Sequence, residues 1–457
     1  MNAETFAENA KAALNDAQLR GALRHATTLF GKRRREAAAS LSNWEDLRSE
    51  ARAIKDEVLL HLDEYLDAFV REAERRGAKV HWAVDAAQAN EIICRLTVER
   101  GARNVVKSKS MTTEEIHLNV ALERAGMRVV ETDLGEYIIQ LAGETPSHII
   151  APAIHKTKRQ VAELFTTELG TPLTDDIGEL TSIARVTLRD WFASADVGIS
   201  GVNFGIVETG TIVIVENEGN IRLTTSLPRT HIAVMGIEKL LPRFADLDVF
   251  LKLLPRSGTG QALSTYQSFI TGTKRNPDDE GPDELHIVLL DNGRSRMLAH
   301  PVTRQSLACI RCGACLNSCP VYQQIGGHAY GSVYPGPIGS VITPQLVGIQ
   351  KTAQLPYASS LCGACREVCP VKIDIPRLLL HLRGEISARE GSGRRRERMA
   401  FKLWAMIMTR PWLYEKTAIA GRLFQRWFAP PVKAWTSGRD LRPIEAESFR
   451  DKWRRTR

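Results

Sequence analysis

The feature of this sequence that most restricts its fold is the placement of its cysteines. Seven of the eight lie between residues 309 and 369, and only Cys94 lies outside that window. The seven are Cys309, Cys312, Cys315, Cys319, Cys362, Cys365 and Cys369. Disulfide scaffolds are small secreted domains that spread their cysteines through the fold, whereas this chain has 457 residues. The clustering therefore indicates thiolate ligands of a metal centre.

The first half of the window reads Cys-x2-Cys-x2-Cys-x3-Cys-Pro, from Cys309 to Pro320. This spacing is typical of bacterial ferredoxins, in which three of the thiolates bind one [4Fe–4S] cluster and the fourth binds another. Gly313 allows the backbone conformations needed close to a cluster, and Pro320 turns the chain away after the last ligand. The motif therefore predicts iron–sulfur chemistry.

The second half, SSLCGACREVCP, repeats the first, but Ser359 stands where the leading cysteine is expected. If the last cysteine of each motif binds the other cluster, the seven thiolates divide into two sets. Cluster 1 takes Cys309, Cys312, Cys315 and Cys369, and cluster 2 takes Cys319, Cys362 and Cys365. We expect cluster 1 to be [4Fe–4S]. Cluster 2 is expected to be [4Fe–4S] completed by Ser359 or water, or a [3Fe–4S] centre.

A zinc ribbon is the main alternative for this region, and it would use Cys309, Cys312, Cys362 and Cys365. It would leave three cysteines and both Cys-Pro pairs without a role, so we favour iron–sulfur clusters. Two clusters in one ferredoxin-like frame relay single electrons. Cys94 stands in the helical pattern NEIICRLTVER and is expected to be a buried apolar side chain.

The rest of the chain predicts three further regions. Residues 1–75 are helical in pattern: apolar side chains recur at helical spacing over residues 44–76, which predicts a helix there, and Gly77 is a plausible helix stop. Residues 76–300 alternate short β-branched runs with helical stretches, which predicts a mostly parallel sheet covered by helices. Residues 301–390 hold the cysteines, and 391–457 form a helical, aromatic-rich tail behind an exposed linker at 391–398. Five of the eight tryptophans lie in this tail: Trp404, Trp412, Trp427, Trp435 and Trp453.

The positive charge of the protein belongs to its tail. Residues 391–457 hold 17 basic and 6 acidic side chains, so the remaining chain has a net charge of −3 although the whole carries +8. We expect the tail to pack on the cysteine region or a partner subunit, with peripheral membrane contact as the alternative and no nucleic acid. No apolar run reaches about 18 residues and no secretory signal is present, which favours a cytoplasmic protein.

Two long segments carry a specific resemblance. CIRCGACLNSCPVYQQIGGHAYGSVYPGPIGSVITP, followed by LPYASSLCGACREVCPVKIDIP, resembles the lactate-utilisation protein B family. GISGVNFGIVETGTIVIVENEGNIRLTTSLPRTHIAVMGIEKLLP resembles the lactate-utilisation (LUD) domain of that family. The resemblance extends from about residue 20 to the C-terminus. It implies an α/β LUD domain, similar in fold to sugar-phosphate isomerases and CoA-transferases, joined to a mainly helical dicluster ferredoxin domain.

The resemblance also implies a function. The chain would be the iron–sulfur electron carrier in a bacterial system that oxidises L-lactate to pyruvate. Its partners would be an iron–sulfur or cysteine-rich subunit and a second LUD protein. The ligand sets given above, with three cysteines for cluster 2, are those the family implies.

Two rival functions stay open at this point: an oxidoreductase that binds the organic acid in its LUD domain, and a scaffold with structural clusters. For the first, Glu208 and Glu216 are candidate carboxylates, although GIVETGTIVIVE is also typical of a β-hairpin. A polar pocket for a small acid could use Asn203, Thr209, Thr224, Ser226 and Arg229. Among these, Arg229 is the best carboxylate clamp, because a guanidinium binds carboxylates through two parallel hydrogen bonds.

Other cofactor fingerprints are missing. GSVYPGPIG lacks the GK[ST] end of a phosphate loop, no GxGxxG follows a predicted strand, and no motif identifies the electron acceptor. His328 and Tyr330, in GGHAYG, are expected to pack the connector between the motifs, with hydrogen bonds to cluster sulfur as the alternative.

Overall fold

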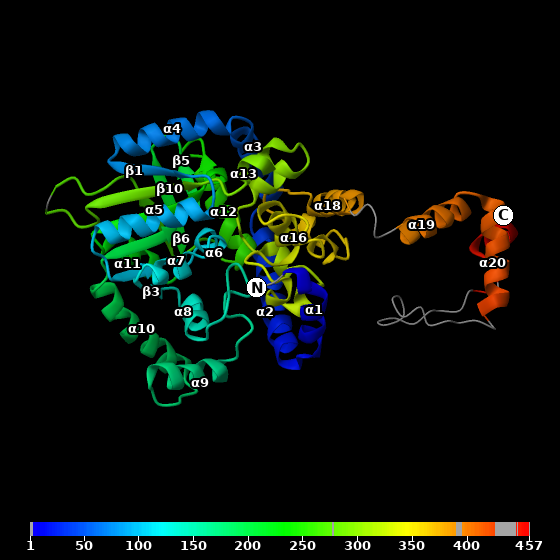
Figure 1. Cartoon of the computed structure of the whole chain (residues 1–457), viewed down its shortest axis with the longest axis horizontal. Helices are drawn as coiled ribbons and strands as arrows, with labels where there is room; N and C mark the ends of the chain where they lie inside the picture. Colours follow the sequence, from blue (N-terminus) through cyan, green and yellow to red (C-terminus); the bar gives the residue numbers. More distant parts are fainter. Residues whose placement is uncertain (1–2, 277, 390–394, 426–444, 446, 457) are drawn as a thin grey trace. The chain divides into compact units, whose positions relative to one another are not determined.

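The computed structural model describes residues 3–276, 278–389, 395–425, 445 and 447–456 (Figure 1). It divides into two compact units, Met1–Ile386 and Ser387–Arg457. The LUD part and the cysteine region therefore belong to one body, and the tail is a separate unit.

A six-stranded sheet forms the centre of the first unit, and every neighbouring pair in it is parallel. In spatial order the strands are β1 (Ala78–Ala83), β10 (Glu284–Leu290), β7 (Thr230–Gly236), β4 (Val197–Gly201), β2 (Asn104–Lys107) and β3 (Arg128–Glu131). All residues of β7 are buried, as expected of a central parallel strand with both faces covered. The parallel α/β sheet predicted from the alternating pattern is thus confirmed.

Each face of this sheet packs against its own set of helices. Ile232 and Val234 of β7 join a core with α5 (Ala86–Glu99) and α7 (Leu118–Arg124). The alternate residues Ala233 and Met235 join a core with α4 (Leu62–Arg75). This alternation follows from the two-residue period of a strand. The other helices of the LUD part are α6 (Met111–Glu115), α8 (Leu134–Leu141), α9 (Lys158–Leu169), α10 (Ile177–Ala193), α11 (Asn220–Ser226), α12 (Leu247–Gly258) and α13 (Arg294–Ala299).

A second sheet of four short strands adjoins the first, in the order β8 (Leu240–Leu241), β5 (Phe204–Ile206), β6 (Thr211–Glu216) and β9 (Tyr266–Ile270). Strands β5 and β6 are antiparallel, with Ile206 opposite Thr211, so GIVETGTIVIVE is the β-hairpin that the sequence allowed. Gly210 in its turn has φ +64°, and a Cβ there would lie 2.5 Å from the Ala73 amide of α4. Only glycine fits this close approach.

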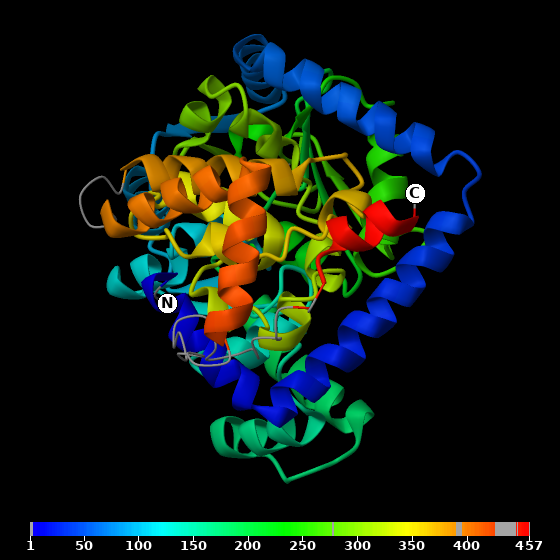
Figure 2. The ribbon, with the colours of Figure 1, turned by 90° about the vertical axis from the view of Figure 1, so that its right-hand side faces the viewer.

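The N-terminal helices pack on the cysteine region. They are α1 (Phe6–Asn15), α2 (Ala17–Ala39) and α3 (Trp44–Leu60), and the predicted helix from 44 to 76 is broken at His61, where α4 follows. Helix α2, the long blue helix of Figure 2, contacts α12, α14 and α15. Leu23 of α2 and Trp44 of α3 share one apolar core with the buried cysteines.

The cysteine region itself consists of short helices and loops. Its α-helices are α14 (Ala314–Asn317), α15 (Tyr322–Ile325), α16 (Gly336–Leu346), α17 (Ala364–Glu367) and α18 (Ile375–Arg389). Four of the five have eleven or fewer residues, so their stability depends on packing and on what the cysteines bind.

The second unit contains α19 (Arg395–Met408), α20 (Pro411–Gln425) and α22 (Phe449–Thr456). Helix α19 begins at Arg395, inside the segment 391–398 that the sequence suggested as a linker. Trp404, Trp412 and Trp453 are each more than half exposed, whereas Trp427 and Trp435 lie outside the described residues. In the described part of the chain, no helix has the length and apolarity needed to cross a membrane.

A buried histidine ties the LUD part to the cysteine region. His148 Nε2 lies 3.0 Å from Asn317 Oδ1, between the first-motif cysteines Cys315 and Cys319, and Nδ1 accepts from the amide of Ile150 at 3.1 Å. Only the neutral imidazole with a proton on Nε2 satisfies both contacts. Burial accordingly lowers the pKa of His148 to about 3.

This histidine makes stability depend on pH. The unfolded chain takes up a proton near pH 6.5 but the folded chain does not, so the contribution of His148 is complete above pH 6.5 and falls as the pH drops toward 3. As the pH falls through this range, protonation of His148 in the unfolded chain should reduce the free energy of unfolding by up to about 1.4 kcal/mol per pH unit. Denaturant titrations at pH 7.5, 6.5 and 5.5 should show a smaller pH dependence for His148→Gln than for the wild type. An identical pH dependence in both proteins would contradict this assignment.

Candidate metal centre

The two cysteine motifs have the same backbone conformation. Arg311 and Leu361, one residue before the second ligand position of each motif, both have positive φ (60° and 56°). Gly313 and Gly363, one residue after it, have φ of 74° and 90° and start the four-residue helices α14 and α17. A left-handed conformation is uncommon for arginine and leucine, so its recurrence fifty residues apart indicates one ligand-binding loop used twice.

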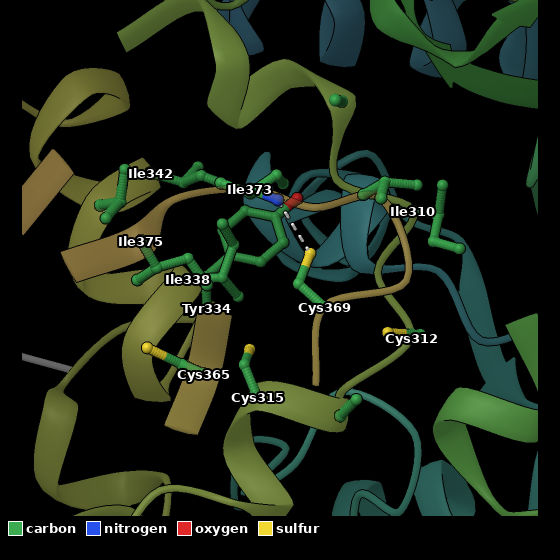
Figure 3. Close-up of a cluster of buried hydrophobic side chains, with 14 of the residues drawn as sticks. Ile310, Cys312, Cys315, Tyr334, Ile338, Ile342, Cys365, Cys369, Ile373 and Ile375 are labelled. Atoms are coloured by element: carbon green, nitrogen blue, oxygen red, sulfur yellow. Dashed lines mark hydrogen bonds between the residues drawn. The ribbon is translucent and has the colours of Figure 1, made fainter. Parts of the chain in front are cut away.

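One group of thiols surrounds a hollow in the apolar core (Figure 3). The cysteines lining it are Cys309, Cys312, Cys315 and Cys369. Apolar side chains complete the wall, among them Ile310, Ile338 and Ile373. The last cysteine of the second motif thus lies beside the first three of the first motif, although 54 to 60 residues separate them in sequence.

Burial controls the ionisation of these thiols. It raises the pKa of Cys312 and Cys315 far above neutral pH, and raises that of Cys369 to about 11 although the amide of Ile373 opposes it. This amide donates to Cys369 Sγ at 3.3 Å (Figure 3). Cys312, Cys315 and Cys369 become thiolates at neutral pH only if a bound metal replaces their protons.

Cations surround this group. Those that interact electrostatically with its thiols are Arg34, Arg48, Lys55, Lys239 and Arg311. The Arg48 guanidinium donates to the carbonyl of Cys369 from Nε at 3.0 Å and from Nη2 at 2.8 Å. Arg34 Nε and Arg311 Nη1 are buried without a hydrogen-bond partner among the described residues. Buried cations beside neutral thiols are unfavourable, whereas cations beside an anionic iron–sulfur cluster are stabilising, so the residues present fit such a cluster.

The remaining thiols form a second group. Cys319 interacts electrostatically with Cys362, and Cys365 with both. Cys319 and Cys365 are buried and Cys362 is exposed. The amide of Ala364 and the hydroxyl of Ser360 lower the pKa of Cys362. The two groups meet where Cys315 interacts with Cys365.

The candidate fourth ligand Ser359 is half-buried, and its Oγ accepts from the amide of Leu361 at 3.1 Å. Tyr330 is fully buried near Cys319 and Cys315, and its hydroxyl has no partner among the described residues. His328 instead lies 2.6 Å from the carbonyl of Thr145, so it holds the connector against the LUD part. Of the two residues of GGHAYG, only Tyr330 could donate to cluster sulfur.

Most of the residues suggested for an acid-binding pocket form hydrogen bonds within the fold instead. Glu208 Oε2 accepts from the amide of Phe244 at 2.8 Å, and the Glu216 carboxylate caps α11 through the amides of Ile221 and Arg222. Arg229 is exposed directly before β7, at the amino end of the strands, which excludes it as the carboxylate clamp of a pocket at their carboxyl ends.

The other candidates are bonded within the fold. Thr209 contacts Thr211, Thr224 donates to the carbonyl of Asn220, and Ser226 donates to that of Arg222. Of the seven candidates, Asn203 and Glu216 line a pocket of about 260 Å³ at the carboxyl ends of the strands.

Sequence reasoning missed three cations of that pocket: Lys109, Lys239 and Arg311. Their position in the sequence could have identified two of them, because Lys109 and Lys239 closely follow buried strands. In a parallel sheet, functional groups gather in the loops after the carboxyl ends of the strands. Cys94 of α5 lies partly buried against the core of the six-stranded sheet, a different core from that of the other cysteines.

Comparison with protein-family models matches three parts of the chain. Residues 66–290 match the LUD domain, residues 305–373 the 4Fe-4S dicluster domain, and residues 381–457 the C-terminal part of lactate utilisation protein B. The match at 305–373 spans both cysteine motifs, so the zinc alternative is not supported.

Full-length relatives agree with the family models. Lactate utilization protein B of Anoxybacillus flavithermus is 43% identical over 99% of this chain and 98% of its own length. That of Geobacillus thermodenitrificans is 45% identical over 93% and 91%. An Escherichia coli K12 relative, named as the uncharacterized electron transport protein YkgF, is 42% identical over 96% and 94%. The chain belongs to the lactate utilization protein B family.

Proposed function

We propose that this chain is the iron–sulfur electron-transfer subunit of a bacterial system that oxidises L-lactate to pyruvate. Membership of the family supports a role in lactate utilisation and electron transfer. The observation that carries the finer proposal is the division of the seven thiols into two groups that meet at Cys315 and Cys365.

The proposed ligands follow this division. Cluster 1 is a [4Fe–4S] centre held by Cys309, Cys312, Cys315 and Cys369, and cluster 2 is held by Cys319, Cys362 and Cys365. The fourth position of cluster 2 falls to Ser359, to water, or to no iron at all in a [3Fe–4S] centre. Bound iron–sulfur clusters supply one-electron transfer.

The protein's own residues set the conditions for that transfer. Arg34 and Arg48 neutralise negative charge in the apolar core, and the Ile373 amide withdraws charge from the Cys369 sulfur. The exposed Cys362 brings the second thiol group to the surface, where a redox partner can approach. We propose as partners a cysteine-rich iron–sulfur subunit and a second LUD protein, with the basic tail docking on one of them or on the inner face of the membrane.

Alanine substitutions separate the two clusters. We expect about seven or eight irons and matching sulfide in the anaerobically purified wild type. Cys309→Ala should remove the EPR signal of cluster 1 and Cys362→Ala that of cluster 2, each with a loss of about half the iron. Cys94→Ala, outside both groups, should retain both signals. Stoichiometric zinc without iron in the wild type would refute the proposal.

The buried hydroxyl of Tyr330 should affect the potential of cluster 2. A hydrogen bond to sulfur stabilises the reduced cluster, and a bond of about 1 kcal/mol corresponds to about 40 mV for one electron. Tyr330→Phe should therefore make the midpoint potential of cluster 2 more negative by about that amount. Tyr322→Phe is the matched control, because the Tyr322 hydroxyl already donates to the carbonyl of Ser147 at 2.7 Å. Equal shifts in the two variants would argue against a bond from Tyr330.

The electron-carrier function is tested with lactate under anaerobic conditions. We expect lactate to bleach the cluster absorbance only when both partner subunits are present, because this chain is proposed to receive electrons and not to withdraw them from lactate. Reduction of the isolated chain by lactate would support the oxidoreductase alternative. Undiminished lactate oxidation by an assembled complex carrying Cys309→Ala and Cys362→Ala would support the scaffold alternative.

A further inference from the structure

A pocket of about 260 Å³ lies at the carboxyl ends of the parallel strands. The segments after four neighbouring strands line it: Lys109 after β2, Asp133 after β3, Asn203 after β4 and Lys239 after β7. Ligands of open α/β sheets bind at this edge, where the loops of several strands converge. Neither the family models nor the names of the relatives assign a ligand to it.

This pocket adjoins the hollow formed by the first group of cysteines. Three residues, Ile149, Arg311 and Cys312, line both the pocket and the hollow. A ligand in the pocket would therefore lie one layer of side chains away from the proposed cluster 1. Such a shared wall allows each site to sense the charge of the other, because the field between them passes through a poorly screened interior.

The cations of the pocket are incompletely paired, although Glu238 interacts electrostatically with Lys239 and Glu218 with Lys109. Among the described residues, neither Lys109 nor Lys239 has a hydrogen-bond or ion-pair partner, and Lys239 is only 8% exposed. The Arg311 guanidinium packs on the Tyr334 ring and approaches Glu238 with Nη2 at 3.6 Å, but its buried Nη1 has no partner. An unpaired buried cation is costly, so a ligand that pairs with it binds favourably.

The acids of the pocket, in contrast, are already engaged with the backbone. Asp133 accepts from the amide of Glu136 at 3.1 Å, and Glu218 accepts from the amide of Leu134 at 3.1 Å, both at the start of α8. Glu216 accepts from two amides of α11. These hydrogen bonds do not cancel the charge of the carboxylates, and equal numbers of acids and bases line the pocket. Burial, however, raises the pKa of Glu216 and raises that of Glu218 to about 7, so the acids carry less than their full negative charge at neutral pH and the pocket has a net positive charge.

We propose that this pocket binds a small organic carboxylate, held by Lys109, Lys239 and Arg311 beside Cys312. The pocket volume of about 260 Å³ is ample for a small acid. Asn203 and the acidic residues of the pocket offer polar partners for a hydroxyl or oxo group next to the carboxylate; these acids are Asp133, Glu216 and Glu218. A phosphate or chloride ion would satisfy the charge but leave these groups unused.

The proposal predicts a redox consequence, which rests on the proposed function because it needs cluster 1. A carboxylate behind the shared wall adds negative charge close to the cluster and so opposes its reduction. Binding should therefore make the midpoint potential of cluster 1 more negative and leave that of cluster 2 nearly unchanged.

The first test measures binding to the anaerobic full-length protein by titration calorimetry. The probes are L-lactate and pyruvate, with inorganic phosphate and chloride as competing anions. We expect one site per chain for the organic acids, and a loss of affinity of about tenfold or more in Lys239→Gln and in Lys109→Gln, since each removes one charge-assisted bond. Lys109 is half-exposed, so its variant should fold even if Lys239→Gln does not.

Lys252→Gln is the matched control, because it also removes one positive charge from the protein. Lys252 belongs to α12, a helix that lines the pocket, but its own side chain lies outside the pocket and pairs with Asp248. The affinity of this variant should equal that of the wild type. The proposal would be overturned if neither L-lactate nor pyruvate binds, if phosphate binds as tightly as these acids, or if Lys109→Gln keeps the wild-type affinity.

The second test is an EPR-monitored redox titration with and without pyruvate. A shift confined to cluster 1, and lost in Lys109→Gln, supports the position of the site, whereas binding that leaves cluster 1 unchanged contradicts it. The two proposals fail separately. If the purified chain contains no iron, the proposed function is wrong, but the calorimetric result still shows whether the pocket binds the acid.

Discussion

Charge balance in a buried site is the constraint on which the cysteine region depends. Five of the seven thiols are buried, and burial raises the pKa of every one of them: Cys312, Cys315, Cys319, Cys365 and Cys369. Without metal they are neutral, and the arginines and lysines around them have too little negative charge nearby. Iron exchanges their protons for metal bonds and creates the anion that the cations match. Because loops and short helices carry these thiols, cluster binding and folding of this region should be strongly coupled.

A buried ion network extends this balance into the LUD part. Arg294, which follows β10, donates to Glu115 of α6 at 2.8 Å and to Glu238, which follows β7, at 2.7 Å. Glu115 accepts a hydrogen bond from the Tyr334 hydroxyl at 2.7 Å, and the Arg311 guanidinium packs over the Tyr334 ring in a cation–π contact. The strand ends and the first cysteine loop are therefore held by one set of charges. Removing Arg294 would leave the buried Glu115 without its ion-pair partner, so the two parts are expected to act as one body.

Local patterns predicted much of this arrangement. The cysteine spacing suggested the division of the thiols, and the β-branched runs of residues 76–300 predicted the parallel sheet. The break at His61 was missed because apolar residues keep helical spacing across it. Arg229 was misplaced for a different reason. A sequence shows which residues flank a strand, but the pocket depends on which strand ends lie together, and that order, β7 beside β4 beside β2, arises only from tertiary packing.

The two thiol groups also differ in a way that would give the proposed electron path a direction. The first is enclosed in the apolar core and shares a wall with the pocket, whereas the second reaches the surface at Cys362. Oxidation of a hydroxy acid to an oxo acid releases two electrons, and each cluster accepts one at a time. As proposed, the two adjacent clusters would hold such a pair briefly while the outer one exchanges electrons with a partner at the surface. An anion site beside the inner cluster would then make the chain's electron affinity respond to the acid that the system consumes or produces.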